Sequence, residues 1–317
     1  MIKVSVIIPN YNHAVFLKDR IDSVLNQTFQ DFEVIIMDDV SPDNSREVIE
    51  GYRTHNKVSQ IIYNEINSGS TFKQWEKGIG LAKGEYIWIA ESDDWCEPTL
   101  LQNLVAAMED DVSCTMAYVQ STAFRNDGSI LWQSKHQKIS EYVDGIVFIK
   151  QCMVFGNAVF NASMAIFRKK TFYEFSKEFT QYKFCGDWLF WIEMSKRGKV
   201  FISGKMLNYF RKHDKDVSGK AYASGLNFIE NVKILNSLKK DDIITEQHYK
   251  TALIEIYYQY ITIKHNFTPD ARKLIDNIFL LENDGKYKRF LQWNYSSRVT
   301  KDVIKNTVKR FLKLKTI

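Results

Sequence analysis

Long apolar runs are missing from this sequence, and proline and glycine are scarce. No apolar run approaches the roughly 18–20 residues of a membrane-spanning helix, which argues against an integral membrane protein. Four prolines and 14 glycines among 317 residues exclude collagen-like and proline-rich architectures. The opening residues MIKVSVIIPNYN turn polar where a signal peptide would stay apolar, so we expect a cytoplasmic protein.

Cysteine and positive charge are also limited. The four cysteines stand far apart with no C-x-x-C pair, so neither a zinc site nor a disulfide framework is expected. The net charge of +5 comes from residues 298–317, which hold seven Lys or Arg against one Asp. The rest of the chain is close to neutral and has no basic stripe with interleaved aromatics, so we expect no nucleic-acid partner.

The first 120 residues alternate between strand and helix patterns. Apolar runs typical of buried strands lie at 4–9, 32–39, 58–64 and 85–94. Helical periodicity lies between and after them, at 14–26, 45–52, 71–84 and 98–109. Such alternation with short connections predicts an open, mostly parallel sheet with flanking helices.

The pattern changes after residue 113. Residues 114–120 and 129–134 flank an Asn-Asp-Gly turn, which predicts an antiparallel pair. Further strands are expected at 163–167, 200–203 and 206–210, with a helix at 187–197. We therefore predict an α/β domain over 1–220, with halves 1–112 and 113–220, and a helical region over 221–317.

Acidic residues gather where the predicted strands end. Asp38 and Asp39 end the second strand, Glu91, Asp93 and Asp94 end the fourth, and the polar segment PNYN (9–12) ends the first. The carboxyl ends of parallel strands meet at one edge, where ligands bind, so we expect these carboxylates to converge around a cation. Oxygen ligands suit Mg²⁺ or Mn²⁺. The alternative is that they are solvated caps and turns, but three polar strand ends at one edge favour a site.

Several motifs together resemble a known family. They are VSVIIPNYN (4–12), VIIMDDVSPDNS (34–45), NSGS (67–70) and KGIGLAKGEYIWIAESDD (77–94). In order and spacing they resemble the family-2 glycosyltransferases with the GT-A fold, and the match is dense from about residue 3 to 110. The resemblance implies a nucleotide-diphospho-sugar donor, a divalent metal, and transfer with inversion at the anomeric carbon.

The resemblance also implies roles for the residues at the first two strand ends. Asp38 and Asp39 match the acidic pair that contacts the nucleotide base and ribose. Pro9, Asn10 and Tyr11 match the loop that packs against the base.

The third acidic motif, Glu91-Ser92-Asp93, occupies the D-x-D position of the family. Asp93 would ligate the metal, and Glu91, one methylene longer than the family's aspartate, would lie near the ribose. Asp94 either supports the site or caps the turn. Lys73 could reach the diphosphate, whereas Lys77 is better explained as a solvated lysine.

Two later motifs complete the resemblance. In CGDWLFWIEMSKRG (185–198), Asp187 fills the position of the general base, while Gly186 replaces the family's glutamate. The alternative for Asp187 is a helix N-cap. In YFRKHDKDVS (209–218), His213 is a candidate metal or diphosphate ligand and Arg211 a phosphate partner.

The resemblance thus implies a metal-dependent, inverting glycosyltransferase of bacterial polysaccharide or O-antigen type, acting on a glycan or lipid-linked acceptor, and we expect it to be non-processive. No Q-x-x-R-W segment of a processive synthase is present. Two alternatives are a sugar-nucleotide pyrophosphorylase, which lacks support because PNYNHAVF has no glycine-rich loop with arginine, and a non-catalytic glycan- or nucleotide-binding module.

Residues 298–317 form a pattern of their own. Val299, Val303, Ile304, Val308, Phe311 and Leu312 recur at helical spacing, and four lysines form a separate row. This pattern fits a basic amphipathic helix on the anionic inner face of a plasma membrane. It equally fits a terminal helix packed on the body with its lysines in solvent.

Overall fold

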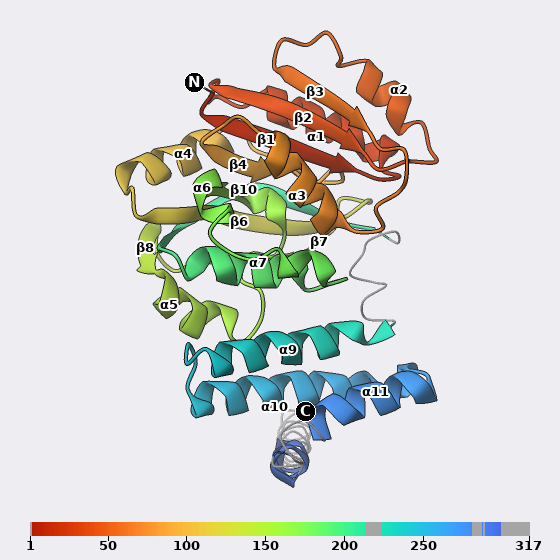
Figure 1. Ribbon diagram of the computed structural model, residues 1–317, viewed down its shortest axis with the longest axis vertical. Coiled ribbons are helices and arrows are strands. Elements are labelled where there is room, and N and C mark those ends of the chain that lie inside the picture. Colours follow the sequence, from red (N-terminus) through yellow and green to blue (C-terminus); the bar gives the residue numbers. More distant parts are fainter. Residues whose placement is uncertain (1, 214–223, 281–286, 288, 299–317) are drawn as a thin grey trace, which may run out of the picture. The chain divides into compact units, whose positions relative to one another are not determined.

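The computed structural model describes residues 2–213, 224–280, 287 and 289–298. The chain divides into two compact units, Met1–Asp216 and Val217–Ile317. The first is an α/β body built on one sheet, and the second is helical (Figure 1). Residues 299–317, which carry the predicted basic amphipathic helix, lie outside the described residues.

One ten-stranded sheet runs through the first unit. Its main path has the order β3-β2-β1-β4-β9-β6-β10-β5, with β7 paired to β6 and β8 to β10. The strands β3, β2, β1 and β4 are parallel neighbours, and helices separate them along the chain. The mostly parallel α/β sheet predicted from the sequence is therefore confirmed. The elements of this half are β1 (Val4–Asn10), α1 (Ala14–Leu25), β2 (Phe32–Asp38), α2 (Ser45–Glu50), β3 (Val58–Tyr63), α3 (Thr71–Leu81), β4 (Tyr86–Ile89) and α4 (Leu100–Asp110).

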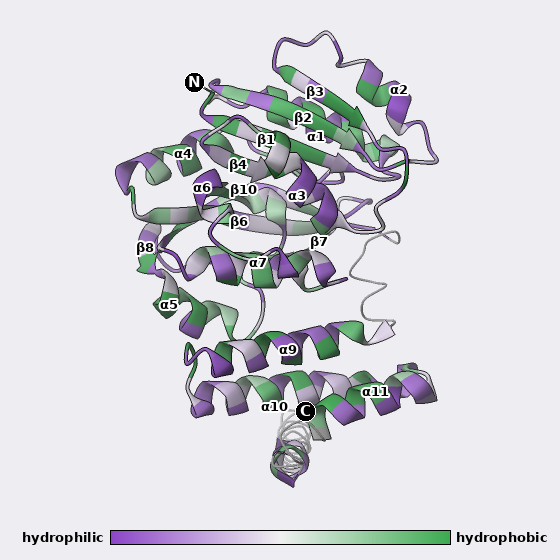
Figure 2. Ribbon diagram, viewed as in Figure 1, coloured by the Kyte–Doolittle hydropathy of each residue, from purple (hydrophilic) through white to green (hydrophobic). Residues whose placement is uncertain are grey.

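Apolar side chains explain why these segments become central strands. Every residue of β1, β2 and β4 is buried, as expected for strands covered on both faces. Figure 2 shows hydrophobic residues along these strands. The predicted strand over 85–94 ends early, at Ile89, because the chain leaves the sheet after Ala90. The next backbone N–H, that of Glu91, donates to the Ser163 hydroxyl (3.0 Å) and no longer to a strand. This departure creates the loop 91–94.

The second half adds antiparallel strands to the sheet. The predicted antiparallel pair is confirmed as β6 and β7. The two short strands expected at 200–203 and 206–210 are one strand, β10, with irregular register between Ile202 and Asn208. It pairs in parallel with β6 and antiparallel with β8 and β5. The elements are β5 (Trp95–Cys96), β6 (Cys114–Arg125), β7 (Ile130–Gln133), β8 (Ser140–Asp144), α5 (Gly145–Phe148), β9 (Ala165–Arg168), α6 (Lys169–Phe172), α7 (Gly186–Ser195) and β10 (Lys199–Lys212).

The second unit is a small helical cluster with an aromatic core. Its longer helices are α9 (Leu226–Lys240), α10 (Glu246–Ile263) and α11 (Pro269–Leu280). Tyr260 of α10 stacks near Phe279 and Phe267, and Phe228 of α9 packs beside the same tyrosine. Within the described residues, none of the helices combines the length and apolarity needed to span a bilayer.

Two glycines of α3 face opposite surroundings and give a matched test of the packing. A Cβ atom on Gly78 would lie 2.5 Å from Ile7 Cγ2 and 3.0 Å from Met37 Sδ, whereas one on Gly80 would meet no atom within 4 Å. Gly78→Ala should therefore destabilise the body by about 1–3 kcal/mol through overpacking. Gly80→Ala should stabilise it by about 0.5–1 kcal/mol, because alanine is the better helix former. Urea unfolding followed by tryptophan fluorescence measures both, and equal effects at the two positions would contradict the close packing of α3 on β1.

Candidate active site

Three loops meet at the carboxyl edge of the parallel strands because β2, β1 and β4 are adjacent. They follow β1 (residues 11–13), β2 (residues 39–41) and β4 (residues 91–94). The sequence prediction that the polar strand ends share one edge is borne out by this strand order. The directions of the individual carboxylates differ, however, and decide what the edge can bind.

Asp38 fastens the first two loops to each other. Its carboxylate accepts hydrogen bonds from Asn10 Nδ2 (2.8 Å) and from the backbone N–H of Ser41 (3.1 Å). The Ser41 hydroxyl donates to Asp38 and accepts from the backbone N–H of Asn12 (2.9 Å). Pro9, Asn10 and Asp38 are buried, whereas the Tyr11 side chain is exposed.

Asp39 instead organises the segment that leads into α3. Its oxygens accept from Asn64 Nδ2 (2.6 Å), the Ser68 hydroxyl (2.7 Å) and Gln74 Nε2 (3.1 Å). An open hollow of about 470 Å³ lies beside these residues. The residues that line it are Tyr63, Asn64, Glu65, Ile66, Ser68, Lys73, Gln74 and Lys77. Both lysines on α3 are therefore placed at this hollow, and Lys77 Nζ donates to Asn64 Oδ1 (2.5 Å).

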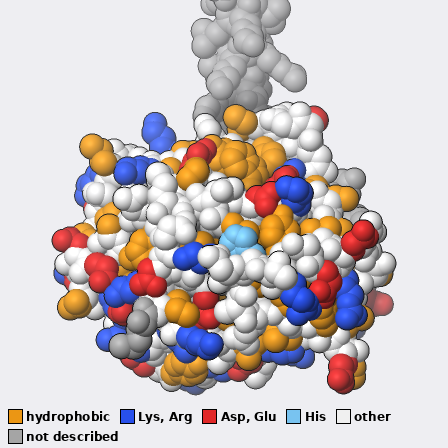
Figure 3. Space-filling view, turned by 90° about the horizontal axis from the view of Figure 1, so that it is seen from above, with side chains coloured by type: hydrophobic (Ala, Val, Ile, Leu, Met, Phe, Trp, Pro, Cys, Tyr) orange, Lys and Arg blue, Asp and Glu red, His pale blue; other side chains and the backbone are white. Residues whose placement is uncertain are grey.

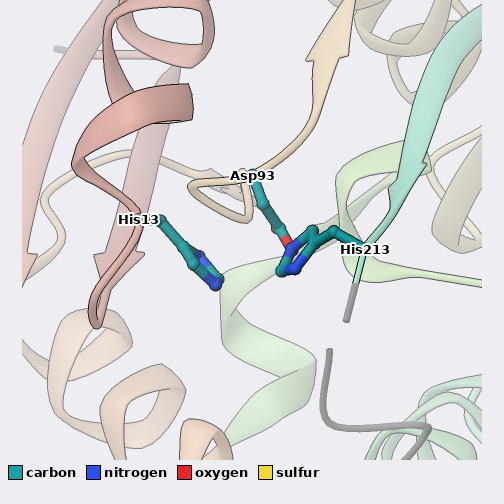
Figure 4. A group of neighbouring side chains, drawn as sticks. All are labelled: His13, Asp93 and His213. Carbon is teal, nitrogen blue, oxygen red and sulfur yellow. The ribbon is translucent and has the colours of Figure 1, made fainter. Parts of the chain in front are cut away.

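Asp93 lies with two histidines, and Figure 4 shows the three side chains pointing toward one another. His213 follows β10, and its Nε2 is 3.1 Å from Asp93 Oδ2. His13 precedes α1, and the ligand atoms of all three residues lie within 4.8 Å of one another. Burial alone would raise the pKa of Asp93, but the His213 hydrogen bond and the charges of both histidines lower it. This carboxylate is therefore the ionised one.

Glu91 and Asp94 turn away from that group. Glu91 Oε1 accepts from Trp75 Nε1 (2.8 Å), and burial, together with the charge of Asp93, raises the pKa of Glu91 to about 8. Asp94 accepts from the side chains of Asn161 and Ser163, and burial raises its pKa as well. The expected convergence of all the acids around one cation is wrong: within the described residues, the cation-competent group contains a single carboxylate. Glu91 and Asp94 point elsewhere because the hydrogen-bond donors Trp75, Asn161 and Ser163 orient them.

Arg211 makes several contacts within the protein. Its Nε donates to the Asp93 carbonyl (2.9 Å), and its guanidinium lies over the rings of Phe16 (4.5 Å) and Phe124 (5.0 Å). Its backbone N–H donates to Asp94 Oδ1 (3.1 Å). The structure thus places Arg211 behind the loop 91–94, where it fixes that loop and the end of β10.

Asp187 lies in the first turn of α7, whose N-cap residue is Cys185. Its Oδ1 accepts from the backbone N–H of Trp188 (2.8 Å), and its Oδ2 accepts from Asn157 Nδ2 (2.9 Å). The carboxylate is thus oriented by a side chain from a different segment. The glutamate expected at position 186 is sterically excluded, because a Cβ there would lie 2.5 Å from the Phe72 ring and the Phe179 carbonyl.

Sequence reasoning missed three residues of this region. His13 stands directly after PNYN, so its position beside the strand edge was the available signal. Asn157 and Asn161 had no signal, because they come from the irregular stretch between β8 and β9. Their contacts to Asp187 and Asp94 exist only in the folded chain.

Comparisons with known proteins agree on one family. The model of "Glycosyl transferase family 2" matches residues 5–175. An uncharacterized glycosyltransferase of Haemophilus influenzae is 26% identical over 80% of this chain and 80% of its own length. The poly(ribitol-phosphate) beta-glucosyltransferase of Bacillus spizizenii is also 26% identical over 80% of this chain, but over 39% of its own length. The aligned parts thus cover from about a third to four fifths of such relatives.

A solved structure shares the fold. Residues 1–349 of TarS from S. aureus, crystallised with UDP-GlcNAc, match with a TM-score of 0.64 at 20% identity, over 93% of this chain and 92% of that one. At this identity the likeness establishes the architecture of the sheet and its helices.

The Asp94 contacts yield a stability prediction. Asp94→Ala would leave Arg20, which is fully buried with Nη2 3.9 Å from Asp94 Oδ2, without its carboxylate. It would also remove the acceptor of Asn161 and Ser163. We expect a loss of about 3–5 kcal/mol, typical of breaking a buried charge pair.

Asp94→Asn should cost less, because the amide oxygen still accepts a hydrogen bond. The exposed Asp31 provides the control, and Asp31→Ala should change stability by less than about 0.5 kcal/mol. Urea unfolding by tryptophan fluorescence measures the body, since six of the seven tryptophans precede residue 200. A midpoint for Asp94→Ala equal to that of the control would contradict the network.

Proposed function

This chain belongs to glycosyl transferase family 2, and on that premise we propose that it transfers a sugar, with inversion, from a nucleotide-diphospho-sugar to an acceptor hydroxyl. The observation that supports the proposal most directly is the position of Asp93. This ionised carboxylate lies after a parallel strand, in the E-S-D triplet, and its side chain contacts His213. The acceptor is a glycan or a lipid-linked sugar, and one sugar is added per encounter. The relative named as a poly(ribitol-phosphate) glucosyltransferase supports a polymeric acceptor.

The donor's nucleotide would lie over the first two loops. Tyr11, exposed at the tip of the β1 loop, offers a ring face for the base. Asp38 holds the loop that carries Tyr11, and Asp39 holds Asn64 at the hollow, where Lys73 is a partner for phosphate. A UDP-sugar is the first donor to test, because TarS, which shares the fold, was crystallised with UDP-GlcNAc.

The diphosphate would lie at Asp93. The residues there fit a divalent cation, because one carboxylate and two imidazoles offer ligand atoms within 4.8 Å of one another. Such a cation supplies positive charge that stabilises the departing nucleotide diphosphate. Arg211 acts here as a positioning residue, since its Nε holds the Asp93 carbonyl and its guanidinium is covered by Phe16 and Phe124.

The acceptor's proton would pass to Asp187. Asn157 Nδ2 and the Trp188 N–H hold the two carboxylate oxygens, so the acid is oriented before the acceptor arrives. Trp75 joins this helix to the donor side, because its Nε1 donates to Glu91 while its ring packs on Phe190 and Trp191 of α7. The Gly186 departure has a steric cause in Phe72 and gives no reason to infer a non-catalytic module.

The general base is tested by Asp187→Asn. Turnover of the UDP-sugar that the protein uses should fall by about 10²–10⁴-fold, the usual contribution of a positioned base. Donor KM and the melting temperature should hardly change, since Asn keeps one acceptor for the Trp188 N–H. Steady-state kinetics with a donor-hydrolysis or transfer assay, together with calorimetry, measures both quantities.

The matched control is Glu178→Gln, an exposed acid in the neighbouring helical turn, which should leave kcat and stability unchanged. Preserved turnover in Asp187→Asn with a lowered melting temperature would instead assign this aspartate a structural role. No turnover in the unmodified protein with UDP-, GDP- or dTDP-sugars, with Mg²⁺ or Mn²⁺, would contradict the proposed function itself.

A further inference from the structure

We propose that His13 is a third ligand of the cation, and that the set His13, Asp93 and His213 selects a transition-metal cation such as Mn²⁺ over Mg²⁺. The set would bind this cation before the nucleotide arrives. This inference rests on the proposed function only in one respect, namely that the donor's diphosphate binds at the same cation.

The three ligands come from separate segments that the fold holds together. His13 precedes α1, Asp93 follows β4, and His213 follows β10 (Figure 4). The two imidazole rings lie edge to face with centroids 5.2 Å apart, and His213 Nε2 is 3.1 Å from Asp93 Oδ2. His13 is thus as much a part of the cluster as His213.

Neighbouring side chains orient the His13 ring. Its Nδ1 is 2.9 Å from the hydroxyl of the buried Ser92, the residue between Glu91 and Asp93. When Nδ1 is the protonated nitrogen and donates to this oxygen, Nε2 carries the lone pair that a metal needs. A hydrogen bond to the second ring nitrogen is the arrangement that usually fixes a metal-binding histidine.

Phe16 holds the two histidines in a shared apolar contact. Its ring centroid is 5.0 Å from that of His213 and 6.1 Å from that of His13. Phe16 is itself covered by the Arg211 guanidinium. The fold therefore holds both imidazole rings in position, so their side chains lose little conformational entropy when a cation binds.

The chemistry of this ligand set determines which cation fits. Mg²⁺ prefers oxygen ligands and retains several waters, whereas imidazole nitrogen favours first-row transition metals. Two histidines and one carboxylate occupy three positions and leave the others for phosphate oxygens and water. An all-oxygen site would instead depend on the nucleotide to bring its cation.

The test titrates Mn²⁺ into the full-length, nucleotide-free protein. Binding is measured as the loss of the EPR signal of free Mn²⁺. We expect one Mn²⁺ per chain, bound more tightly than Mg²⁺ in competition, because the two imidazoles add nitrogen ligands that Mg²⁺ disfavours. His13→Gln should weaken Mn²⁺ binding by about 10–100-fold and change Mg²⁺ binding little. Asp93→Asn should abolish Mn²⁺ binding, and His55→Gln, at an exposed histidine, should have no effect.

Pulsed EPR on the unmodified protein counts the coordinated imidazoles without relying on any variant. Two ¹⁴N couplings in the wild type and one in His13→Gln support the proposal. A single coupling in the wild type, or unchanged Mn²⁺ affinity in His13→Gln, overturns it. If Mn²⁺ binds through two imidazoles but the protein turns over no UDP-sugar, this inference holds and the proposed function is rejected. If the protein turns over a UDP-sugar but shows a single ¹⁴N coupling, the proposed function holds and this inference is rejected.

Discussion

The buried carboxylate of Asp94 is the constraint on which the candidate site depends. It accepts hydrogen bonds from Asn161 and Ser163, which precede β9, and from the backbone N–H of Arg211 in β10. Asp93 is the preceding residue and His213 lies two residues beyond Arg211, so fixing Asp94 fixes both. Ser163 further accepts from the Glu91 N–H, which turns the chain out of the sheet and forms the loop. One carboxylate thus sets the distance between two groups that are 120 residues apart in sequence.

This arrangement carries an electrostatic cost that the rest of the body must offset. Glu91 is half-buried and Asp94 is fully buried, and both lie near Asp93. Arg20 is the cation beside them, with Nε donating to the Glu91 carbonyl and Nη2 near Asp94. Burial raises the pKa of Glu91 to about 8 and that of Asp94 to about 7, and the Arg20 charge opposes both increases. The pKa of Asp93 is lowered, so Asp93 is the most acidic of the three carboxyl groups. Burying carboxylates with one shared cation is unfavourable, and the fully buried, mostly apolar strands β1, β2 and β4 provide the compensating stability. Asp93, whose pKa is lowered, is the one carboxylate that lies with the two histidines in the described part of the chain.

The sequence predicted the strand edge well because apolar runs and polar strand ends are local features. Because the carboxyl ends of parallel strands share one edge, the strand pattern placed Asp93 at that edge without knowledge of the strand order. The directions of the acids could not be predicted, since each depends on a donor that only folding brings near: Asn10 for Asp38, Ser68 for Asp39, Trp75 for Glu91. The division of residues 200–210 into two strands was wrong because the irregular register within β10 resembles a turn in sequence. Asn157 was unpredictable for the same reason as Asn161, since both lie in a stretch without periodicity.

Helix α3 connects the parts of the site that the sequence motifs describe separately. Asp39 accepts from Gln74 in the first turn of α3, and the next residue, Trp75, donates to Glu91 and packs on α7. Phe72, one turn earlier, fills the space that a side chain at position 186 would need, directly before Asp187. Direct contacts therefore run from the hollow beside Asp39 to the helix of the candidate base. The glycine at 186 is therefore explained by the aromatic residues on α3. Because Phe72 and Trp75 pack against α7, a side chain at position 186 would prevent the helix from approaching them.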